Sequence, residues 1–137
     1  MKTFFQDKQG NPLLLTGLQS HNSSTGSPMM EQTIRAIREF HGNLLEAPVY
    51  WYWLEPEEGV YDTTHVRELI HTAREAGLYL VILWFATNKN GHPNYVPEYV
   101  KIRPDIYRLA VEPDGLPVPS MSPHCQATMR ADQRAFV

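Results

Sequence analysis

The sequence predicts an α/β fold built from repeated strand–loop–helix units. Short apolar runs, typical of strands buried on both faces of a parallel sheet, alternate with segments whose apolar residues recur at helical spacing. Of the 137 residues, 42% are hydrophobic and 20% are charged, which is the balance of one compact domain and not of a disordered chain. Alternating strands and helices with short links imply right-handed βαβ units and a parallel sheet.

The first unit begins with an apolar strand. Residues 3–18 read TFFQ, a polar turn and PLLLTGL, so we expect a hairpin whose second arm, near 13–18, is the first core strand. Ser27 and Pro28 then match a helix N-cap followed by proline in the first turn, and Gly42 stops the helix. Apolar residues at helical spacing between these positions predict an amphipathic helix.

The second and third strands are the most apolar segments of the chain. NLLEAPVYW, near 43–51, predicts strand two, and LYLVILWF, near 78–85, predicts strand three. Between them, Asp62 caps a second amphipathic helix that Gly77 ends.

The last third of the chain changes character. Residues 86–123 hold seven of the 11 prolines, so we expect a long irregular loop there. Residues near 123–137 begin with a second serine–proline pair and predict a third helix that is cut short, because no stop signal precedes the last residue. We therefore expect a single domain over residues 1–137.

Two architectures fit this order of elements: an open doubly wound sheet and part of a (β/α)8 barrel. The open sheet needs a phosphate loop or a switch-point crevice, and the sequence contains neither GxGxxG nor GxxxxGK[ST]. A barrel places function on the loops after its strands, where polar and aromatic residues gather in this chain. We expect the first three βα units of an incomplete TIM barrel, since a full barrel typically takes about 250 residues.

Composition excludes several classes of partner. The formal net charge is −3 and no run of Lys and Arg occurs, which disfavours nucleic acid. The longest apolar stretch is far shorter than the roughly 20 residues of a membrane helix, and no signal peptide is seen, so the default expectation is a cytoplasmic protein. The single Cys125 leaves no cysteine-built zinc site or internal disulfide, and we expect no cofactor and no metal.

The loops at the carboxyl ends of the strands combine aromatic rings with amide, hydroxyl and ammonium groups. This combination suits a sugar, whose C–H face packs on a ring while its hydroxyls need donors and acceptors. The alternative is that Trp51 and Trp84 are core rings and that the amides form turns. The residues concerned are His21, Asn22 and Ser23 after strand one, Trp51, Trp53 and Glu55 after strand two, and Trp84, Asn88, Lys89, Asn90, His92, Asn94 and Tyr95 after strand three.

The acidic residues of these loops do not by themselves form a catalytic pair. Glu57 and Glu58 are expected to be solvated, because neighbours in one turn rarely converge on one bond, whereas glycoside hydrolysis needs two carboxylates that face each other. Glu46 lies within an apolar strand and needs a partner if it is buried. It is either a member of a structural ion pair or a residue of the site.

Four runs resemble the amino-terminal part of β-galactosidase-like glycoside hydrolases, similar to families 42 and 35 of the retaining (β/α)8-barrel clan. They are GLQSHNSS, NLLEAPVYWYWLEPEEGVYD, GLYLVILWFATNKNGHPNYVPEYVK and SPHCQATMRADQRAFV. The resemblance implies an acid/base glutamate after strand four and a nucleophile glutamate at the end of strand seven. Neither position occurs in this chain, so no catalytic residue is assigned.

The same resemblance implies that the first three strand-end loops line a sugar pocket. Close relatives have a tryptophan at the position of Asn88. Family 35 enzymes have a tyrosine near the position of Pro48 that helps to hold galactose, and a Cys-Ala-Glu segment after strand three that is absent from this chain. The implied sugar contacts are His21, Asn22, Glu46, Trp51, Glu55, Trp84, Lys89 and Asn90.

Two functions are open at this point, beside a third option, a small α/β protein of unrelated function whose motifs coincide with those of the family. The first is a retaining glycoside hydrolase that acts on β-galactosides or related β-linked sugars, with both catalytic glutamates beyond this chain and no activity in the chain alone. The alternative is a non-catalytic carbohydrate-binding or partner-binding module. In either case the apolar edge of strand three is expected to remain unpaired, which favours self-association.

Overall fold

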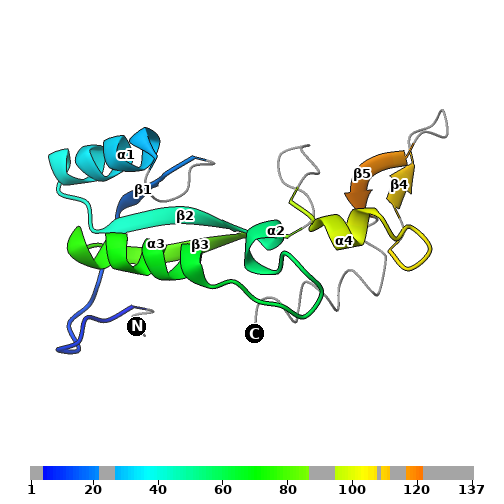
Figure 1. The fold of residues 1–137 in the computed structure, drawn as a ribbon. Helices are drawn as coiled ribbons and strands as arrows, with labels where there is room; N and C mark the ends of the chain where they lie inside the picture. Colours follow the sequence, from blue (N-terminus) through cyan, green and yellow to red (C-terminus); the bar gives the residue numbers. More distant parts are fainter. Residues whose placement is uncertain (1–4, 22–26, 87–94, 108, 112–116, 122–137) are drawn as a thin grey trace.

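Two long helices pack on a three-stranded sheet. A short helix and a two-stranded sheet follow later in the chain (Figure 1). This computed structural model describes residues 5–21, 27–86, 95–107, 109–111 and 117–121. Within these ranges, no helix is long and apolar enough to cross a membrane. The elements are β1 (Gly17–Gln19), α1 (Pro28–Glu39), β2 (Leu44–Tyr50), α2 (Trp51–Leu54), α3 (Thr64–Glu75), β3 (Tyr79–Phe85), α4 (Glu98–Lys101), β4 (Leu109–Val111) and β5 (Pro117–Met121).

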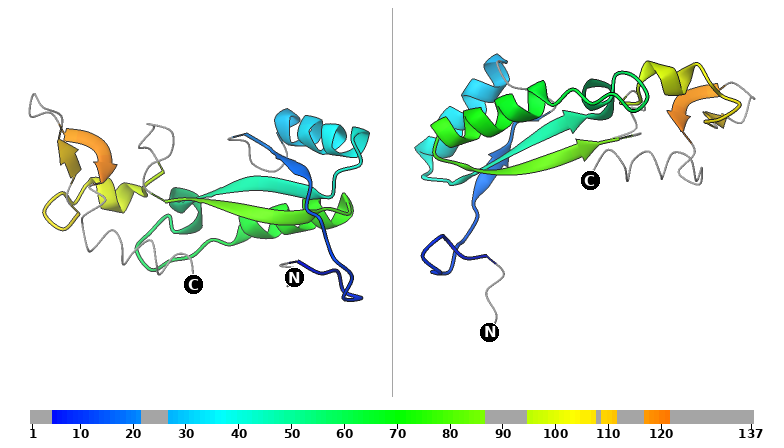
Figure 2. Two further views of the ribbon diagram at one scale, coloured as in Figure 1. Left: turned by 180° about the vertical axis from the view of Figure 1, so that it is seen from behind. Right: turned by 60° about the horizontal axis from the view of Figure 1, so that its bottom comes forward.

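The three-stranded sheet is parallel throughout, with β2 in the middle. Leu18 of β1 pairs with Leu45 of β2, which pairs in turn with Leu80 of β3. Helices α1 and α3 connect the strands and lie on the same face of the sheet (Figure 2). The parallel sheet and its connecting helices confirm the predicted α/β class.

Both long helices begin close to the predicted caps. The Ser27 hydroxyl accepts a hydrogen bond from the Met30 N–H at 3.2 Å, and α1 starts at the following proline. At α3, the Asp62 carboxylate accepts a hydrogen bond from the Thr64 N–H at 2.8 Å. Gly77 follows α3 with φ 69°, a left-handed conformation that glycine adopts without strain.

The main core lies between the sheet and the two helices. Alternate residues of β2 point to the same face, and those that face the helices are buried. Neither α1 nor α3 covers the opposite face, to which Glu46, Pro48 and Tyr50 belong by alternation. The buried residues of the main core are Met30, Ile37, Leu45, Ala47, Val49, Leu69 and Ala73.

β3 forms one edge of the three-stranded sheet. Its helix-side residue Ile82 is 40% exposed, and Tyr79 is 45% exposed. An apolar strand at the edge of a sheet can pair with a further strand through its backbone N–H and C=O groups. Self-association through this edge stays a prediction.

The early part of the chain differs from the predicted hairpin and strand. The hairpin consists of one bridge between Gln6 and Pro12, and β1 begins at Gly17 and not near 13. The Asn43 side chain accounts for the late start, because it binds the backbone of Leu14 and Thr16, each at 2.8 Å. A Cβ at Gly17 would overlap the Leu44 carbonyl, so the close approach of β1 to β2 depends on glycine.

Two further segments differ from the sequence-based expectation. Strand two ends at Tyr50, and Trp51–Leu54 form the helical turn α2. The proline-rich segment holds α4 and the antiparallel pair β4 and β5, and prolines are tolerated in such a pair because both strands are edges. The helix expected near 123–137 lies outside the described residues.

We expect Ile37→Val to lower the free energy of unfolding by about 0.5–1.5 kcal/mol, because Ile37 is fully buried and the deletion leaves a small cavity. The matched control is Ile102→Val at a side chain that is 68% exposed, where the change should stay within about 0.5 kcal/mol. Urea unfolding followed by circular dichroism measures both. Equal losses would show that the core is not where we place it.

Candidate functional site

The carboxyl ends of β2 and β3 carry a group of packed aromatic rings. Tyr50 and Phe85, the last residues of the two strands, pair in register, and their rings meet edge to face at 5.5 Å. The chain comes back to these strand ends at Tyr95, whose carbonyl accepts a hydrogen bond from the Tyr52 N–H at 3.1 Å. We call these rings the aromatic cluster: Tyr50, Tyr52, Trp53, Phe85 and Tyr95.

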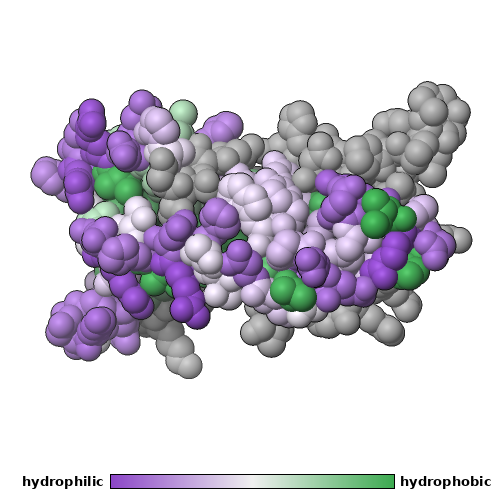
Figure 3. Space-filling view, in the orientation of Figure 1, coloured by the Kyte–Doolittle hydropathy of each residue, from purple (hydrophilic) through white to green (hydrophobic). Residues whose placement is uncertain are grey.

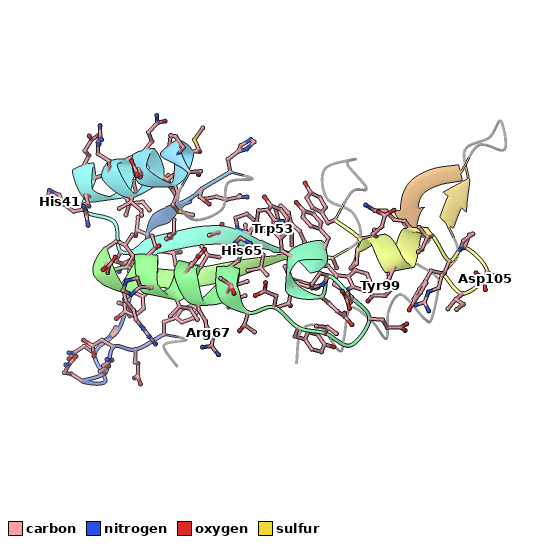
Figure 4. The ribbon with its side chains drawn as sticks, viewed as in Figure 1. His41, Trp53, His65, Arg67, Tyr99 and Asp105 are labelled. Carbon is pink, nitrogen blue, oxygen red and sulfur yellow. The ribbon has the colours of Figure 1, made fainter. Side chains whose placement is uncertain are left out.

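Within the aromatic cluster, Tyr50 is the ring that the others contact. The rings of Tyr52 and Tyr95 stack nearly parallel to it, with centroids at 5.5 and 5.3 Å. Trp53 meets it edge to face at 4.7 Å and stacks on His65 of α3 at 4.4 Å, so these two side chains lie together in Figure 4. The cluster therefore joins both strand ends to the start of α3.

The surface over the aromatic cluster is neither strongly apolar nor strongly polar. Tyr52, Trp53 and Tyr95 are all half-buried, so parts of their rings reach solvent. In Figure 3, the region around α2 is pale, in contrast to the hydrophilic side chains over α1. Half-exposed rings of this kind can pack against a ligand that has both C–H and hydroxyl groups.

Tyr50 and Tyr52 keep their protons well above neutral pH. Burial, followed by the neighbouring Tyr52 and Tyr95, raises the pKa of Tyr50 from 10.0 to about 12. Burial also raises the pKa of Tyr52, with a further contribution from Tyr95. Their hydroxyls are therefore neutral groups that can both donate and accept hydrogen bonds.

A buried carboxylate fixes the turn beneath the aromatic cluster. Glu55 is 5% exposed and accepts hydrogen bonds from the Trp51 indole N–H and from the Gly59 N–H, each at 2.8 Å. Each carboxylate oxygen receives one of these donors, which offsets the cost of burying the charge. The spacing of four residues between Trp51 and Glu55 explains why β2 ends in a helical turn.

The segment of residues 95–107 packs against this turn. Val96, Val100 and Tyr107 form a second apolar core with Trp51, which is fully buried. Tyr99 of α4 is labelled in Figure 4, and burial raises its pKa, followed by the negative charge of Glu55 and a hydrogen bond to that carboxylate.

Glu58 is exposed, as its sequence context predicts, with a side chain that is 51% accessible, but its carboxylate also has protein partners. Its carboxylate forms an ion pair with Arg103 at 2.6 Å and accepts a hydrogen bond from the Tyr107 hydroxyl at 3.1 Å. The sequence does not reveal this pairing, because the partner lies 45 residues away and no local pattern encodes it. Glu57 is also exposed.

The structure separates the predicted sugar contacts into groups. His21 is exposed, with φ 56°, just beyond β1. Glu46 is half-buried on the face that α1 and α3 leave open, and it lies four residues, or about 13 Å along the strand, from Tyr50. Partial exposure to solvent relieves the cost of its charge. Three further predicted contacts lie outside the described residues: Asn22, Lys89 and Asn90.

Trp51 and Trp84 are core rings, which is the alternative that the sequence left open. Trp51 has no exposed surface, and Trp84, paired in register with Val49 on the helix side, packs against both apolar cores. Tyr50 is a member of the site that the sequence-based prediction missed. The sequence feature that could have identified Tyr50 is the alternation of side chains along β2. It places position 50, at the end of the strand, on the face that α1 and α3 leave uncovered.

The described site is suited to binding. The carboxylates of Glu55 and Glu58 both accept hydrogen bonds from protein donors. Among the described residues, no group of three His, Cys, Asp or Glu side chains could hold a metal ion.

A family model for glycoside hydrolase family 42, described as beta-galactosidase, matches residues 23–128. No curated protein matches the chain. An exo-beta-1,4-mannosidase from Opitutaceae bacterium strain TAV5 is 22% identical with a TM-score of 0.53, over 71% of this chain and 19% of that chain.

Two structures of endo-glycoceramidase II from Rhodococcus sp. match this chain, and each match covers 98% of it. The complex with a five-membered iminocyclitol is 19% identical with a TM-score of 0.58, and the match covers 32% of that chain. The lactosyl-enzyme intermediate is 22% identical with a TM-score of 0.53, and the match covers 33% of that chain. The present chain thus spans between a fifth and a third of the length of these TIM-barrel structures, and the likeness confirms the expected fold.

We expect Glu55→Ala to lower the free energy of unfolding by about 1.5–3 kcal/mol, because the Trp51 and Gly59 N–H groups lose a charged acceptor. The matched control is Glu57→Ala at an exposed carboxylate, with an expected change below about 0.5 kcal/mol. Urea unfolding measures both, and the indole N–H resonance of Trp51 reports the lost hydrogen bond. An unshifted indole resonance in Glu55→Ala would refute this role of the Glu55 carboxylate.

The raised pKa of Tyr50 predicts a loss of stability in alkali. The folded state keeps a phenolic proton that the unfolded chain releases, so the contribution is complete below pH 10 and is lost as the pH rises through about 12. We expect Tyr50→Phe to flatten the fall of the urea midpoint over this range. Ile102→Val, at a side chain that is 68% exposed and carries no titratable group, is the control and should keep the wild-type slope.

Proposed function

The chain belongs to glycoside hydrolase family 42, the beta-galactosidase family, and we propose that it forms part of the sugar-binding face of an enzyme that hydrolyses β-galactosides. The observation that carries the proposal is the aromatic cluster at the carboxyl ends of β2 and β3, inside the segment that matches the family. Function in a (β/α)8 barrel is located at that end of the strands.

The chemistry of the aromatic cluster suits a sugar ring. The half-exposed rings of Tyr52, Trp53 and Tyr95 offer flat surfaces for the C–H face of a pyranose. Neutral tyrosine hydroxyls close to these surfaces can donate to and accept from the sugar hydroxyls. His21, Asn22, Glu46, Lys89 and Asn90 are proposed as further polar contacts, whereas Trp51, Glu55 and Trp84 support the site from the core.

The proposed mechanism is retaining hydrolysis with two carboxylic acids. One acid protonates the leaving oxygen, and the other forms a glycosyl-enzyme intermediate that water then hydrolyses. We propose that both acids come from barrel strands that this chain does not contain, because Glu55 and Glu58 are held by protein donors. The residues of this chain would bind and orient the sugar.

The choice of galactose rests on the family description. The solved structures that share the fold bear the names of a β-mannosidase and an endoglycoceramidase, so β-mannosides are the natural competing substrates. Stacking on tyrosines does not distinguish these sugars by itself, because both present C–H groups to a ring. Polar contacts to the hydroxyl groups at C2 and C4 would decide between them.

We expect the complete enzyme that contains this chain to hydrolyse 4-nitrophenyl β-galactoside faster than 4-nitrophenyl β-mannoside, and to release the β-anomer of galactose first. Release of nitrophenol and proton NMR of the new anomeric centre measure the two results. The present chain alone should show no turnover above background, because we propose that both catalytic acids lie outside it and that its residues bind and orient the sugar.

Each other outcome contradicts a separate part of the proposal. A preference for the mannoside would refute galactose specificity, and the α-anomer as first product would refute the retaining mechanism. Turnover by the present chain would show that its own carboxylates are catalytic. Sugar binding by the complete protein without any hydrolysis would favour the non-catalytic binding module.

A further inference from the structure

The position of Tyr95 in the aromatic cluster depends on a segment with little structure of its own. Residues 95–107 contain only the helix α4, which has four residues, and a helix that short is not stable without tertiary contacts. Val96 and Val100 pack on Trp51, but apolar contacts have no preferred direction and do not fix a register. Directional contacts hold this segment in one place, and they include the hydrogen bond from the Tyr52 N–H to the Tyr95 carbonyl and the one between Tyr99 and the Glu55 carboxylate.

Arg103 supplies further directional contacts toward the end of the segment. One N–H of its guanidinium donates to the Glu58 carboxylate at 2.6 Å, and the same nitrogen lies 3.3 Å from the Tyr107 hydroxyl. Its Nε donates to the Tyr99 carbonyl at 3.1 Å. The guanidinium carbon also lies over the rings of both tyrosines, 5.6 and 5.2 Å from their centroids.

These contacts join two loops that follow different strands. Glu58 belongs to the loop after α2, which Glu55 fixes through Gly59, whereas Arg103 belongs to the segment after β3. The hydroxyl of Tyr107 donates to Glu58 at 3.1 Å and so closes a triangle of hydrogen bonds. Because the side chains of Arg103 and Glu58 are 33% and 51% exposed, the strength of the link comes from this network and not from an isolated ion pair.

We propose that Arg103 is a positioning residue for the aromatic cluster: its link to Glu58 holds residues 95–107 against the loop of residues 55–60 and thereby keeps Tyr95 on Tyr50. The consequence for sugar affinity rests on the proposed function, whereas the positioning itself does not. Without the link, the rings would adopt the binding arrangement for only part of the time. The apparent affinity for sugar would then fall in proportion to the population of that arrangement.

The Tyr52 amide proton reports the position of Tyr95 directly, because it is bonded to the Tyr95 carbonyl. In hydrogen exchange of the full chain, we expect Arg103→Ala to speed exchange of this amide and of the Val100 amide by about fivefold or more. Amides of α1 and α3 should keep their wild-type rates. The matched control is Arg67→Ala, an exposed arginine of α3 that bonds only to Thr63 among the described residues.

Two milder variants keep the test valid if Arg103→Ala unfolds. Arg103→Lys retains a charge but not the planar group between two rings, so its exchange rate should be intermediate. Glu58→Gln removes the charge of the partner and should speed exchange of the Tyr52 amide in the same direction as Arg103→Ala. If the Tyr52 amide exchanges at the wild-type rate in both Arg103→Lys and Glu58→Gln, the positioning role is overturned.

A kinetic experiment on the complete enzyme separates the role of Arg103 from the proposed function. With 4-nitrophenyl β-galactoside, we expect Arg103→Ala to raise KM by about three- to tenfold with little change in kcat, since binding is affected and the acids are not. An unchanged KM together with faster exchange of the Tyr52 amide would overturn the link to sugar binding. No hydrolysis of the galactoside by the wild-type enzyme would refute the proposed function, and hydrogen exchange alone would then decide whether Arg103 positions Tyr95.

Discussion

The carboxyl end of the sheet depends on one buried interaction, the hydrogen bond between the Trp51 indole N–H and the Glu55 carboxylate. A carboxylate that is 5% exposed is costly unless its oxygens are satisfied, and here the second donor comes from Gly59 across the loop. The pair therefore fixes the end of β2, the turn α2 and the following loop together. Tyr52 and Trp53 lie within this turn, so their presentation follows from it.

In the same arrangement, charged groups hold the loops in place and neutral groups face the proposed ligand. Glu55 and Glu58 accept hydrogen bonds from protein donors, and the aromatic cluster itself, within the described residues, presents rings and phenol hydroxyls. Such a surface can hold a neutral, hydroxyl-rich ligand without the cost of desolvating a charge. This is the physical basis for proposing a sugar-binding role, beyond membership of glycoside hydrolase family 42.

Sequence reasoning recovers the elements whose signals are local. The apolar runs of β2 and β3 and the serine–proline start of α1 follow from short stretches of sequence, and so does the parallel α/β class. The contacts of Tyr95 with Tyr50 and of Arg103 with Glu58 join residues 45 positions apart, and no periodicity encodes them. The tryptophan at position 51 shows the remaining ambiguity, because an aromatic residue at a strand end suits a core and a sugar site equally well.

Contact between the aromatic cluster and sugar can be observed by NMR of the complete enzyme with labelled tyrosines, titrated with methyl β-galactoside. We expect saturable shifts of the ring resonances of Tyr52 and Tyr95, with Tyr61 and Tyr79 unchanged because they lie outside the cluster. Saturable binding that leaves Tyr52 and Tyr95 unshifted would show that the sugar is bound elsewhere and that the aromatic cluster is not its site.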